Sequence, residues 1–297
     1  MTTPAATARA AATLRRRYAR RYVTRRVGLY VAAVITALIC AGPFVWSLIT
    51  AFKQNRDLYN PKNNPFVFNR APTSDHVTYL FTSTAFTTFV VNTLVIGVLV
   101  VLITLALGLP AAYALARLDR PWSGPMAIGI FMVYLVPPSL LFLSLSRLVV
   151  GVGLQDSSWS LVLVYPTITI PVSVWLLMGF LKGIPKDIEE QAMVDGYSRV
   201  GAFVRAVVPL AYPGIVAVIV FAFTLTASEF IYALAFVAPT AQMPISTGVP
   251  TQLVRGDVFF WQSLQAAAVL VAVPIAFVFN WFLDKFVAGF TLGAVKE

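Results

Sequence analysis

The sequence has 297 residues, of which 59% are hydrophobic and only 11% are charged, and its mean hydropathy is +0.80. A soluble domain carries about a quarter charged residues. This composition therefore excludes an ordinary soluble protein, because so little charge cannot cover a surface exposed to water. The net charge of +10 is concentrated in short segments between apolar stretches, which is typical of contact with anionic lipid headgroups rather than with nucleic acid.

Six charge-free stretches are long enough to cross the hydrocarbon core as helices, which takes about 20 residues. In chain order they lie within residues 27–52, 86–116, 125–146, 159–181, 206–228 and 261–283. The first is too long for a signal-peptide core and lacks a small-x-small cleavage pattern, so we expect it to stay in the mature protein. We predict an all-α integral membrane protein of six transmembrane helices, with one membrane domain (27–286) between a basic tail (1–26) and a second tail (287–297).

Prolines interrupt several of the later hydrophobic stretches. Pro137 and Pro138 in the third helix and Pro171 in the fourth remove backbone donors in mid-span, so we expect both helices to kink. After the fifth helix, residues 239–257 hold several prolines and glycines, which argue against a further spanning helix. We predict that this stretch is an external loop.

The placement of lysine and arginine predicts the orientation. Sixteen of the 22 basic residues lie in the two tails, in the turn 117–124 and in the loop 182–209, when Lys285 is counted with the C-terminal tail. Six crossings put these four segments on one side of the membrane. Because basic residues concentrate on the cytoplasmic side, both termini and the loop 182–209 are predicted to be cytoplasmic, in a bacterial inner membrane.

The loop 182–209 is patterned as two short helices. Pro185 suits the first turn of a helix, and three acidic side chains lie near its positive end: Asp187, Glu189 and Glu190. Gly196 can adopt the left-handed conformation that ends a helix, and Ser198 is a candidate N-cap for a second one. In that second helix one apolar stripe is predicted to contain Val200, Phe203, Val204 and Val207. From the pattern alone, this pair of helices fits either a docking surface or a hairpin that packs on its own bundle.

The same loop resembles that of the permease subunits of binding-protein-dependent ATP-binding-cassette (ABC) importers, whose pattern is E-A-A-x3-G-x9-I-x-L-P. Glu190, Ala192, Gly196 and Pro209 occupy matching positions. The sequence departs from the pattern at three positions: Gln191, Ala206 and Val208. Shorter matches to the maltose-type carbohydrate permeases occur in order along nearly the whole chain: residues 43–53, Asn92 with Thr93, residues 111–117 and residues 289–296.

This resemblance implies the type I importer permease fold and a role as one subunit of a larger complex that imports a sugar or related polyol. The implied partners are a second related permease subunit, two nucleotide-binding ATPase subunits that hold ATP and Mg²⁺, and an external substrate-binding protein. The implied contacts with the ATPase lie in the loop, at Glu189, Glu190, Ala192, Asp195, Gly196, Ser198, Phe203 and Pro209. The chain itself has no G-x-x-x-x-G-K-[ST] phosphate loop, so we expect neither a bound cofactor nor enzymatic activity.

Substrate contacts are harder to predict. Glu229 is the one acidic residue at the predicted membrane depth, where a charge usually faces a water-filled cavity or a polar partner. It is either a carboxylate that accepts hydrogen bonds from a sugar or, as we favour, a structural contact to Arg255 or to backbone N–H groups. Ser228 and Asn92 complete the candidate pathway residues.

Three other functions fit the sequence less well. One is an ion-coupled secondary transporter, which needs intramembrane charge relays and often shows inverted repeats. Another is an importer whose cargo is not a sugar. A membrane-embedded enzyme or a metal site needs converging side chains. Because the chain has a single cysteine, Cys40, and a single histidine, His76, zinc binding and a histidine-based catalytic triad lack partners.

Overall fold

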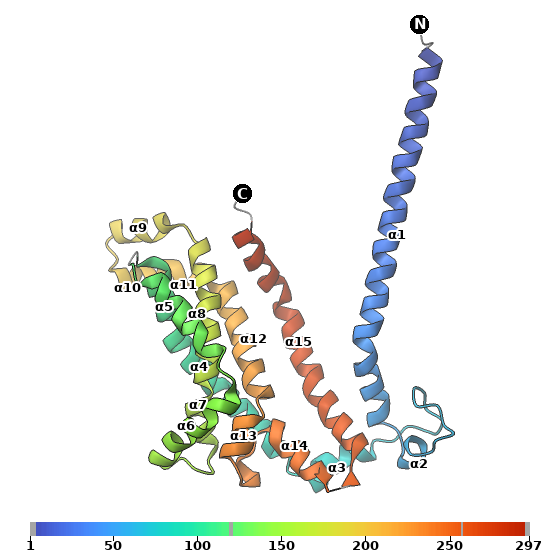
Figure 1. Ribbon diagram of the computed structural model, residues 1–297, viewed down its shortest axis with the longest axis vertical. Helices are drawn as coiled ribbons and strands as arrows, with labels where there is room; N and C mark the ends of the chain where they lie inside the picture. The colour runs from blue at the N-terminus through green and yellow to red at the C-terminus, as the bar shows by residue number, and fades with distance from the viewer. Residues whose placement is uncertain (1–3, 119–120, 257, 295–297) are drawn as a thin grey trace. The chain divides into compact units, whose positions relative to one another are not determined.

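The computed structural model describes the backbone of residues 4–118, 121–256 and 258–294, and the side chains of residues 22–118, 121–256, 258 and 260–282. The chain divides into two compact units, Met1–Ser74 and Asp75–Glu297 (Figure 1). The first unit contains α1 (Pro4–Ala51) and α2 (Asn55–Leu58). The second contains α3 (Asp75–Ser83), α4 (Phe86–Arg117), α5 (Ser123–Tyr134), α6 (Pro138–Gly151), α7 (Ser158–Val164), α8 (Pro166–Gly183), α9 (Lys186–Val194), α10 (Arg199–Ala202), η1 (Phe203–Val207), α11 (Val208–Leu210), α12 (Tyr212–Ser228), α13 (Ile231–Phe236), η2 (Thr240–Gln242), α14 (Ile245–Leu253), the strands β1 (Val254–Arg255) and β2 (Val258–Phe259), and α15 (Trp261–Ala294).

The predicted all-helical architecture is confirmed, apart from the short antiparallel pair β1–β2. Within the described residues, four helices are long and apolar enough to cross a membrane, and the number rises to six if each of two bent helix pairs is one span. The four are 22–51 within α1, α4, residues 158–183 formed by α7 and α8, and 261–282 within α15. The candidate span within α1 has no buried residue in its apolar window, which suits a helix that lipid surrounds.

The third predicted helix is broken rather than kinked. The adjacent prolines separate α5 from α6, and the two helices meet at an angle of 92°. Proline lacks the N–H group that continues a helix and disfavours helical conformation in the residue before it, so two in succession end α5 and let α6 begin at Pro138. By contrast, α8 continues through Pro171.

The fifth predicted helix begins later than the sequence suggested. Residues 206–210 belong to η1 and α11, and the spanning part, α12, begins at Tyr212 after a bend of 75°. Residues 239–257 are not an irregular loop, because they include η2, α14 and β1. At nine residues, α14 is too short to span, so the prediction that no further helix crosses here stands.

The second unit is built around α4, which packs against α8 and α12, while α12 also packs against α15 (Figure 1). A glycine allows close packing of α12 on α8: a Cβ atom placed on Gly214 would lie 2.6 Å from Cγ of Phe180. Small residues at such contacts let helix backbones approach, which matters in lipid because van der Waals packing replaces the hydrophobic effect.

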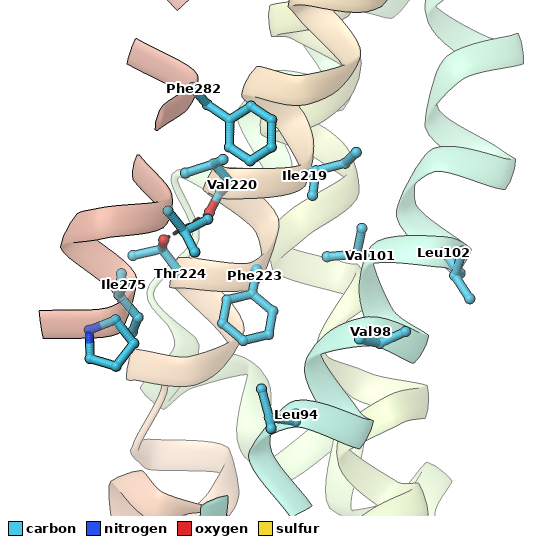
Figure 2. Close-up of a pocket in the computed structure, with 12 residues that line it drawn as sticks. Leu94, Val98, Val101, Leu102, Ile219, Val220, Phe223, Thr224, Ile275 and Phe282 are labelled. Atoms are coloured by element: carbon cyan, nitrogen blue, oxygen red, sulfur yellow. Dashed lines mark hydrogen bonds between the residues drawn. The ribbon is translucent and has the colours of Figure 1, made fainter. Parts of the chain in front are cut away.

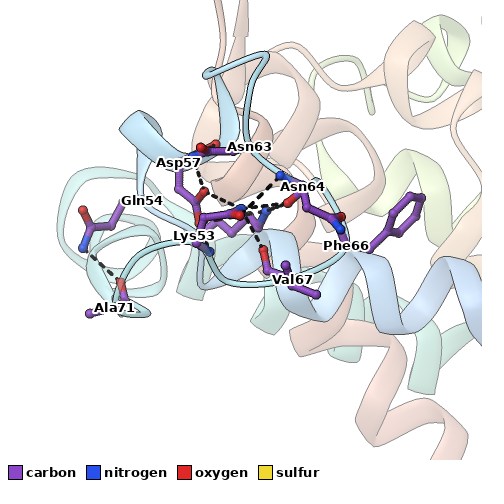
Figure 3. Close-up of polar contacts among 9 residues, drawn as sticks. Lys53, Gln54, Asp57, Asn63, Asn64, Phe66, Val67 and Ala71 are labelled. Atoms are coloured by element: carbon purple, nitrogen blue, oxygen red, sulfur yellow. Dashed lines mark hydrogen bonds and ion pairs between the residues drawn. The ribbon is translucent and has the colours of Figure 1, made fainter.

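A polar loop (residues 52–74) follows α1 and has little regular structure beyond α2 (Figure 3). Its centre is the buried pair Lys53 and Asp57, whose Nζ and Oδ2 atoms are 3.9 Å apart. Lys53 donates to the Asn64 carbonyl at 2.9 Å, and Asp57 accepts from the side chains of Asn63 at 2.7 Å and Asn69 at 3.0 Å. Side-chain hydrogen bonds therefore hold this loop together in place of the backbone hydrogen bonds of a helix or sheet.

Opposing influences act on the pKa of Asp57. Burial raises it, but the hydrogen bonds from Asn69 and Asn63 and the Lys53 ammonium group together outweigh burial and hold the pKa below its ordinary value. Asp57 is therefore ionised at neutral pH and bonds its partners as a carboxylate.

Candidate functional site

The loop that the sequence analysis singled out forms a helical knob (residues 186–210), made of α9, a turn, and the continuous run α10–η1–α11. Within the second unit, the knob lies at the end opposite α6, α13 and α14 (Figure 1).

The turn of the knob depends on Gly196. The φ angle of this residue is +95°, a left-handed conformation that glycine adopts without a Cβ clash. The N–H of Gly196 donates to the Met193 carbonyl and that of Tyr197 to the Ala192 carbonyl, both at 3.1 Å. This pair of bonds is the Schellman motif, which satisfies carbonyls at a helix end. The prediction that Gly196 ends the helix in a left-handed conformation is confirmed.

The second limb of the knob begins with a side-chain cap. Ser198 accepts a hydrogen bond from the Gly201 N–H at 3.1 Å, as predicted. Pro185 occupies the N-cap position of α9, one residue before the position expected. The first limb therefore ends, and the second begins, through local signals that are legible in the sequence.

The four residues of the apolar stripe predicted for the second limb are not buried alike. Val207 is buried and Phe203 is half-buried, whereas Val200 and Val204 are 71% and 53% exposed. Residues Phe203–Val207 form a π-helix, whose wider turn changes the hydrogen-bond pattern of this limb. Pro209 contributes to this change, because it cannot donate to the carbonyl four residues earlier.

The outer face of the knob combines apolar and charged groups. Val194 is 87% exposed, and Gln191, Glu190, Asp195 and Pro209 are exposed with it. Ala192 is half-buried. Together with Val200 and Val204, Val194 leaves apolar side chains of both limbs exposed, which is unfavourable in water. Charged residues are exposed on the same limbs.

Glu189 does not belong to this outer face, although the resemblance grouped it with the ATPase contacts. It is 6% exposed and points toward the last turns of α4. Its carboxylate accepts a hydrogen bond from the Tyr113 hydroxyl, and its Oε2 lies 3.4 Å from Nε of Arg117. The Tyr113 ring also contacts Phe203, with 4.3 Å between ring centroids. Tyr113 and Arg117 were not candidates in the sequence analysis.

All three predicted substrate-pathway residues have hydrogen-bond partners within the chain. Asn92 donates through Nδ2 to the carbonyls of Ala241 and Met243, both at 2.9 Å, and so fixes the segment before α14 on α4. Ser228 is exposed and donates to the Leu225 carbonyl at 3.3 Å.

Glu229 acts as a cap for α13. Its carboxylate accepts from the N–H of Tyr232 at 3.0 Å and from that of Ala233 at 3.2 Å. The structural interpretation that we favoured, with backbone N–H groups as partners, is therefore supported. Arg255, the other partner considered, donates instead to the Gln252 carbonyl at 3.0 Å.

An open groove of about 460 Å³ lies among α4, α12 and α15 (Figure 2). It is lined by Leu94, Val98, Val101, Leu102, Ile219, Val220, Phe223, Thr224, Pro274, Ile275, Val278 and Phe282. The Thr224 hydroxyl, which is the polar side-chain group in this lining, donates to the Val220 carbonyl at 2.7 Å. A sugar needs several hydrogen-bonding partners, so this groove suits apolar contacts and not a carbohydrate.

No three His, Cys, Asp or Glu side chains converge as metal ligands would in the part of the chain that the structure describes. The polar clusters that do occur, at Lys53–Asp57 and at Arg117–Glu189, are paired ions in which the carboxylate is already engaged.

Comparison with known proteins identifies relatives along nearly the whole chain. Residues 83–291 match the family described as binding-protein-dependent transport system inner membrane component. The chain is 31% identical to a sulfoquinovosyl glycerol transport system permease protein of Agrobacterium fabrum, over 90% of this chain and 93% of that protein. It is 29% identical to a trehalose/maltose transport system permease protein of Thermococcus litoralis, over 91% and 97% of the two chains.

A diacetylchitobiose uptake system permease protein of Streptomyces coelicolor is 30% identical, over 91% of this chain and 97% of that protein. Among solved structures, a bacterial ABC transporter involved in the import of the acidic polysaccharide alginate is similar. The TM-score is 0.74 at 17% identity, over 88% of this chain and 97% of that one. At this identity, the likeness describes the fold alone.

Proposed function

Because the chain belongs to the binding-protein-dependent transport system inner membrane components, we propose that its knob docks on a separate ATPase subunit and that its membrane domain forms half of a path for a sugar or related polyol. The chain is a multi-pass permease subunit of an ABC importer in the inner membrane, and ATP hydrolysis resides in another part of the complex.

The exposed apolar face of the knob carries the docking proposal. Val194, Val200 and Val204 would remain in water if the knob only packed on its own bundle. Burying them against a partner removes apolar surface from water at about 25 cal/mol per Å², while Glu190 and Asp195 supply charges at the rim. Gly196 and Ser198 give this face its shape, so they serve docking indirectly.

The complex that we propose has two related permease subunits, two nucleotide-binding subunits that hold ATP and Mg²⁺, and an external substrate-binding protein. The family description names the dependence on a binding protein. A similar solved structure, with a TM-score of 0.63, is an alginate ABC transporter in complex with a pentasaccharide-bound periplasmic protein. Six crossings, with the α5–α6 pair counted as one and α12 alone as another, would place both termini and the knob in the cytoplasm, in keeping with the concentration of basic residues there.

The nature of the cargo is proposed from the relatives. Their names refer to sulfoquinovosyl glycerol, trehalose and maltose, and diacetylchitobiose. All of these are glycosides or oligosaccharides, which supports a carbohydrate or polyol as the cargo of this chain.

Cysteine crosslinking tests the docking proposal. Val194→Cys and Val200→Cys, each made in a Cys40→Ser background because Cys40 is the natural thiol, should crosslink to the ATPase subunit in the assembled complex. Thr240→Cys is the matched control, since Thr240 is exposed and lies in the chain between α13 and α14, which are at the opposite end of the same unit (Figure 1). A membrane-impermeant thiol reagent should label positions 194 and 200 from the cytoplasmic side and position 240 from the outside.

Crosslinks to the ATPase from positions 194 and 200 but not from 240 support the proposal. Labelling of position 194 from the outside, or equal crosslinking from all three positions, would overturn it.

A further inference from the structure

The inner face of the knob is attached to α4 by a small buried cluster, which consists of Tyr113, Arg117 and Glu189. Tyr113 and Arg117 are four residues apart and therefore share one face of the last turns of α4. Glu189 is in the first turn of α9, where the positive end of the helix dipole favours a carboxylate. Arg117 ends α4, where the negative end favours a cation. The pair thus joins two helix ends of opposite polarity.

Tyr113 contacts both limbs of the knob through different parts of its side chain. Its hydroxyl donates to Glu189 of α9, and its ring packs against Phe203, the first residue of η1. A displacement of either limb therefore acts on the same α4 side chain. Since α4 packs against α8 and α12, movement of α4 reaches the centre of the bundle.

Arg117 is incompletely bonded in this arrangement. Its Nε and Nη2 atoms are buried and have no hydrogen-bond partner, and Nε lies 3.4 Å from the Glu189 carboxylate, beyond an ordinary charge-assisted hydrogen bond. A permanent anchor normally satisfies a buried guanidinium group, because unmet donors are costly in a low dielectric. A small shift of α9 toward α4 would bring the carboxylate into bonding distance.

We propose that Tyr113, Arg117 and Glu189 form a mechanical link that transmits movement of the knob to α4, with the Arg117–Glu189 contact tightening as α9 moves. These are positioning residues that touch neither ATP nor cargo. The inference rests on the proposed docking of the knob on an ATPase. It differs from that docking in location, because the link lies on the buried face and docking uses the exposed face.

Uptake per ATP hydrolysed is the measurement that tests the link. Glu189→Gln keeps the size and one acceptor but removes the charge, and Tyr113→Phe removes the hydroxyl while keeping the ring against Phe203. In the purified complex in vesicles, each variant should assemble and hydrolyse ATP, while uptake per ATP falls about tenfold, which is typical of one lost coupling interaction. The double variant should lose no more than the worse single one, because the two residues act through one contact.

Glu190→Gln provides the contrast on the same helix. Glu190 is exposed and belongs to the proposed docking face, so this change should weaken the crosslink from position 194 rather than lower uptake per ATP. Normal uptake per ATP in Glu189→Gln and Tyr113→Phe would overturn the link, as would a parallel loss of thermal stability, ATP hydrolysis and uptake, which indicates packing alone. If the crosslink from position 194 is absent from the unaltered complex, the docking proposal fails instead.

Discussion

The knob (186–210) and the polar loop (52–74) are both short segments that leave long apolar helices, yet they are ordered by opposite means. In the knob, the backbone forms helices whose ends are satisfied within a few residues by Gly196 and Ser198. In the polar loop, four-residue α2 is the main regular element. Side-chain amides there bond to carbonyls as far as 17 residues away and to a carboxylate 12 residues away. The order of the knob therefore depends on backbone conformation, and the order of the polar loop depends on a charged side chain at its centre.

This difference predicts different sensitivities. A segment held by local caps should respond to changes in backbone freedom and hardly to pH. A segment held around one carboxylate should respond to the charge of that carboxylate and tolerate most changes of its backbone.

Gly196→Val should have the largest effect. The left-handed φ angle costs a residue other than glycine about 1–3 kcal/mol, and a β-branched one more. We expect uptake to be lost while the subunit still reaches the membrane. Gly183→Ala is the control, since that glycine precedes the knob with open space around its Cα and without a left-handed φ. Normal uptake by Gly196→Val would mean that the turn is dispensable.

Asp57→Asn should release the polar loop. The amide removes the charge that Lys53 faces and offers one acceptor atom where Asn63 and the Asn69 side chain and N–H now bond two oxygens. Proteolysis and hydrogen exchange within 52–74 should accelerate, with the knob unchanged. Asp187→Asn, which alters an exposed carboxylate of α9, should leave the protection of the polar loop intact; equal effects of both changes would argue against the network.

Acid should reproduce this effect in the unaltered protein. The pKa of Asp57 is lower in the folded loop than its ordinary value of 3.8, so its ionised form stabilises the loop above that value. This stabilisation is lost as the pH falls through the lower, folded value. Protection of the loop should therefore persist from neutral pH to about pH 4 and decline below it. The decline should be absent from Asp57→Asn, and a decline already complete by pH 6 would contradict the assignment.

Glu229 extends the comparison to a carboxylate that caps nearby backbone N–H groups. Glu229→Leu leaves two N–H groups of α13 without their acceptor, at about 1–3 kcal/mol for each group that stays unsatisfied, whereas Glu229→Gln keeps one acceptor. Thermal stability and uptake should fall together, more for leucine than for glutamine. A loss of uptake at full stability would instead place Glu229 on the substrate path.

Ser198→Ala should have the smallest effect. Loss of an N-cap typically costs about 1 kcal/mol, which a helix packed on its bundle can bear. Uptake should fall modestly, and Ser198→Asp, which keeps an acceptor, should restore it. Measuring uptake at rising temperature would reveal the difference most clearly. A complete loss of uptake in Ser198→Ala would show that the cap contributes more to the stability of the knob than expected.

Much of the fold follows from local sequence. Hydropathy located the membrane helices, and the signals at Gly196 and Ser198 located the turn between the two limbs of the knob, because each acts within four or five residues. The errors occurred where local rules conflict. Pro137 and Pro138 break a helix that hydropathy continues, and a π-helix at 203–207 takes the place of the regular helix that the pattern predicted.

The contacts that matter most for the candidate site could not be predicted from local sequence. Glu189 meets Tyr113 across 76 residues of sequence, and neither residue type nor spacing indicates such a pairing. A weak signal did exist, since Tyr113 and Arg117 stand four apart at a helix end, which places them on one face. Their partner became identifiable only once the chain was folded.

The break between α5 and α6 has a consequence for biogenesis. At 12 and 14 residues, these helices are each shorter than the hydrocarbon is thick. The turn between them ends at Pro137 and α6 begins at Pro138, and neither proline donates a backbone hydrogen bond. Lipid cannot solvate the carbonyls of such a turn, so non-helical backbone at this depth persists only against protein or water. Because residues 135–137 are exposed in the isolated chain, a newly inserted copy presents the bilayer with a surface that it tolerates poorly until another surface covers it. Orphan copies should therefore be short-lived in the cell.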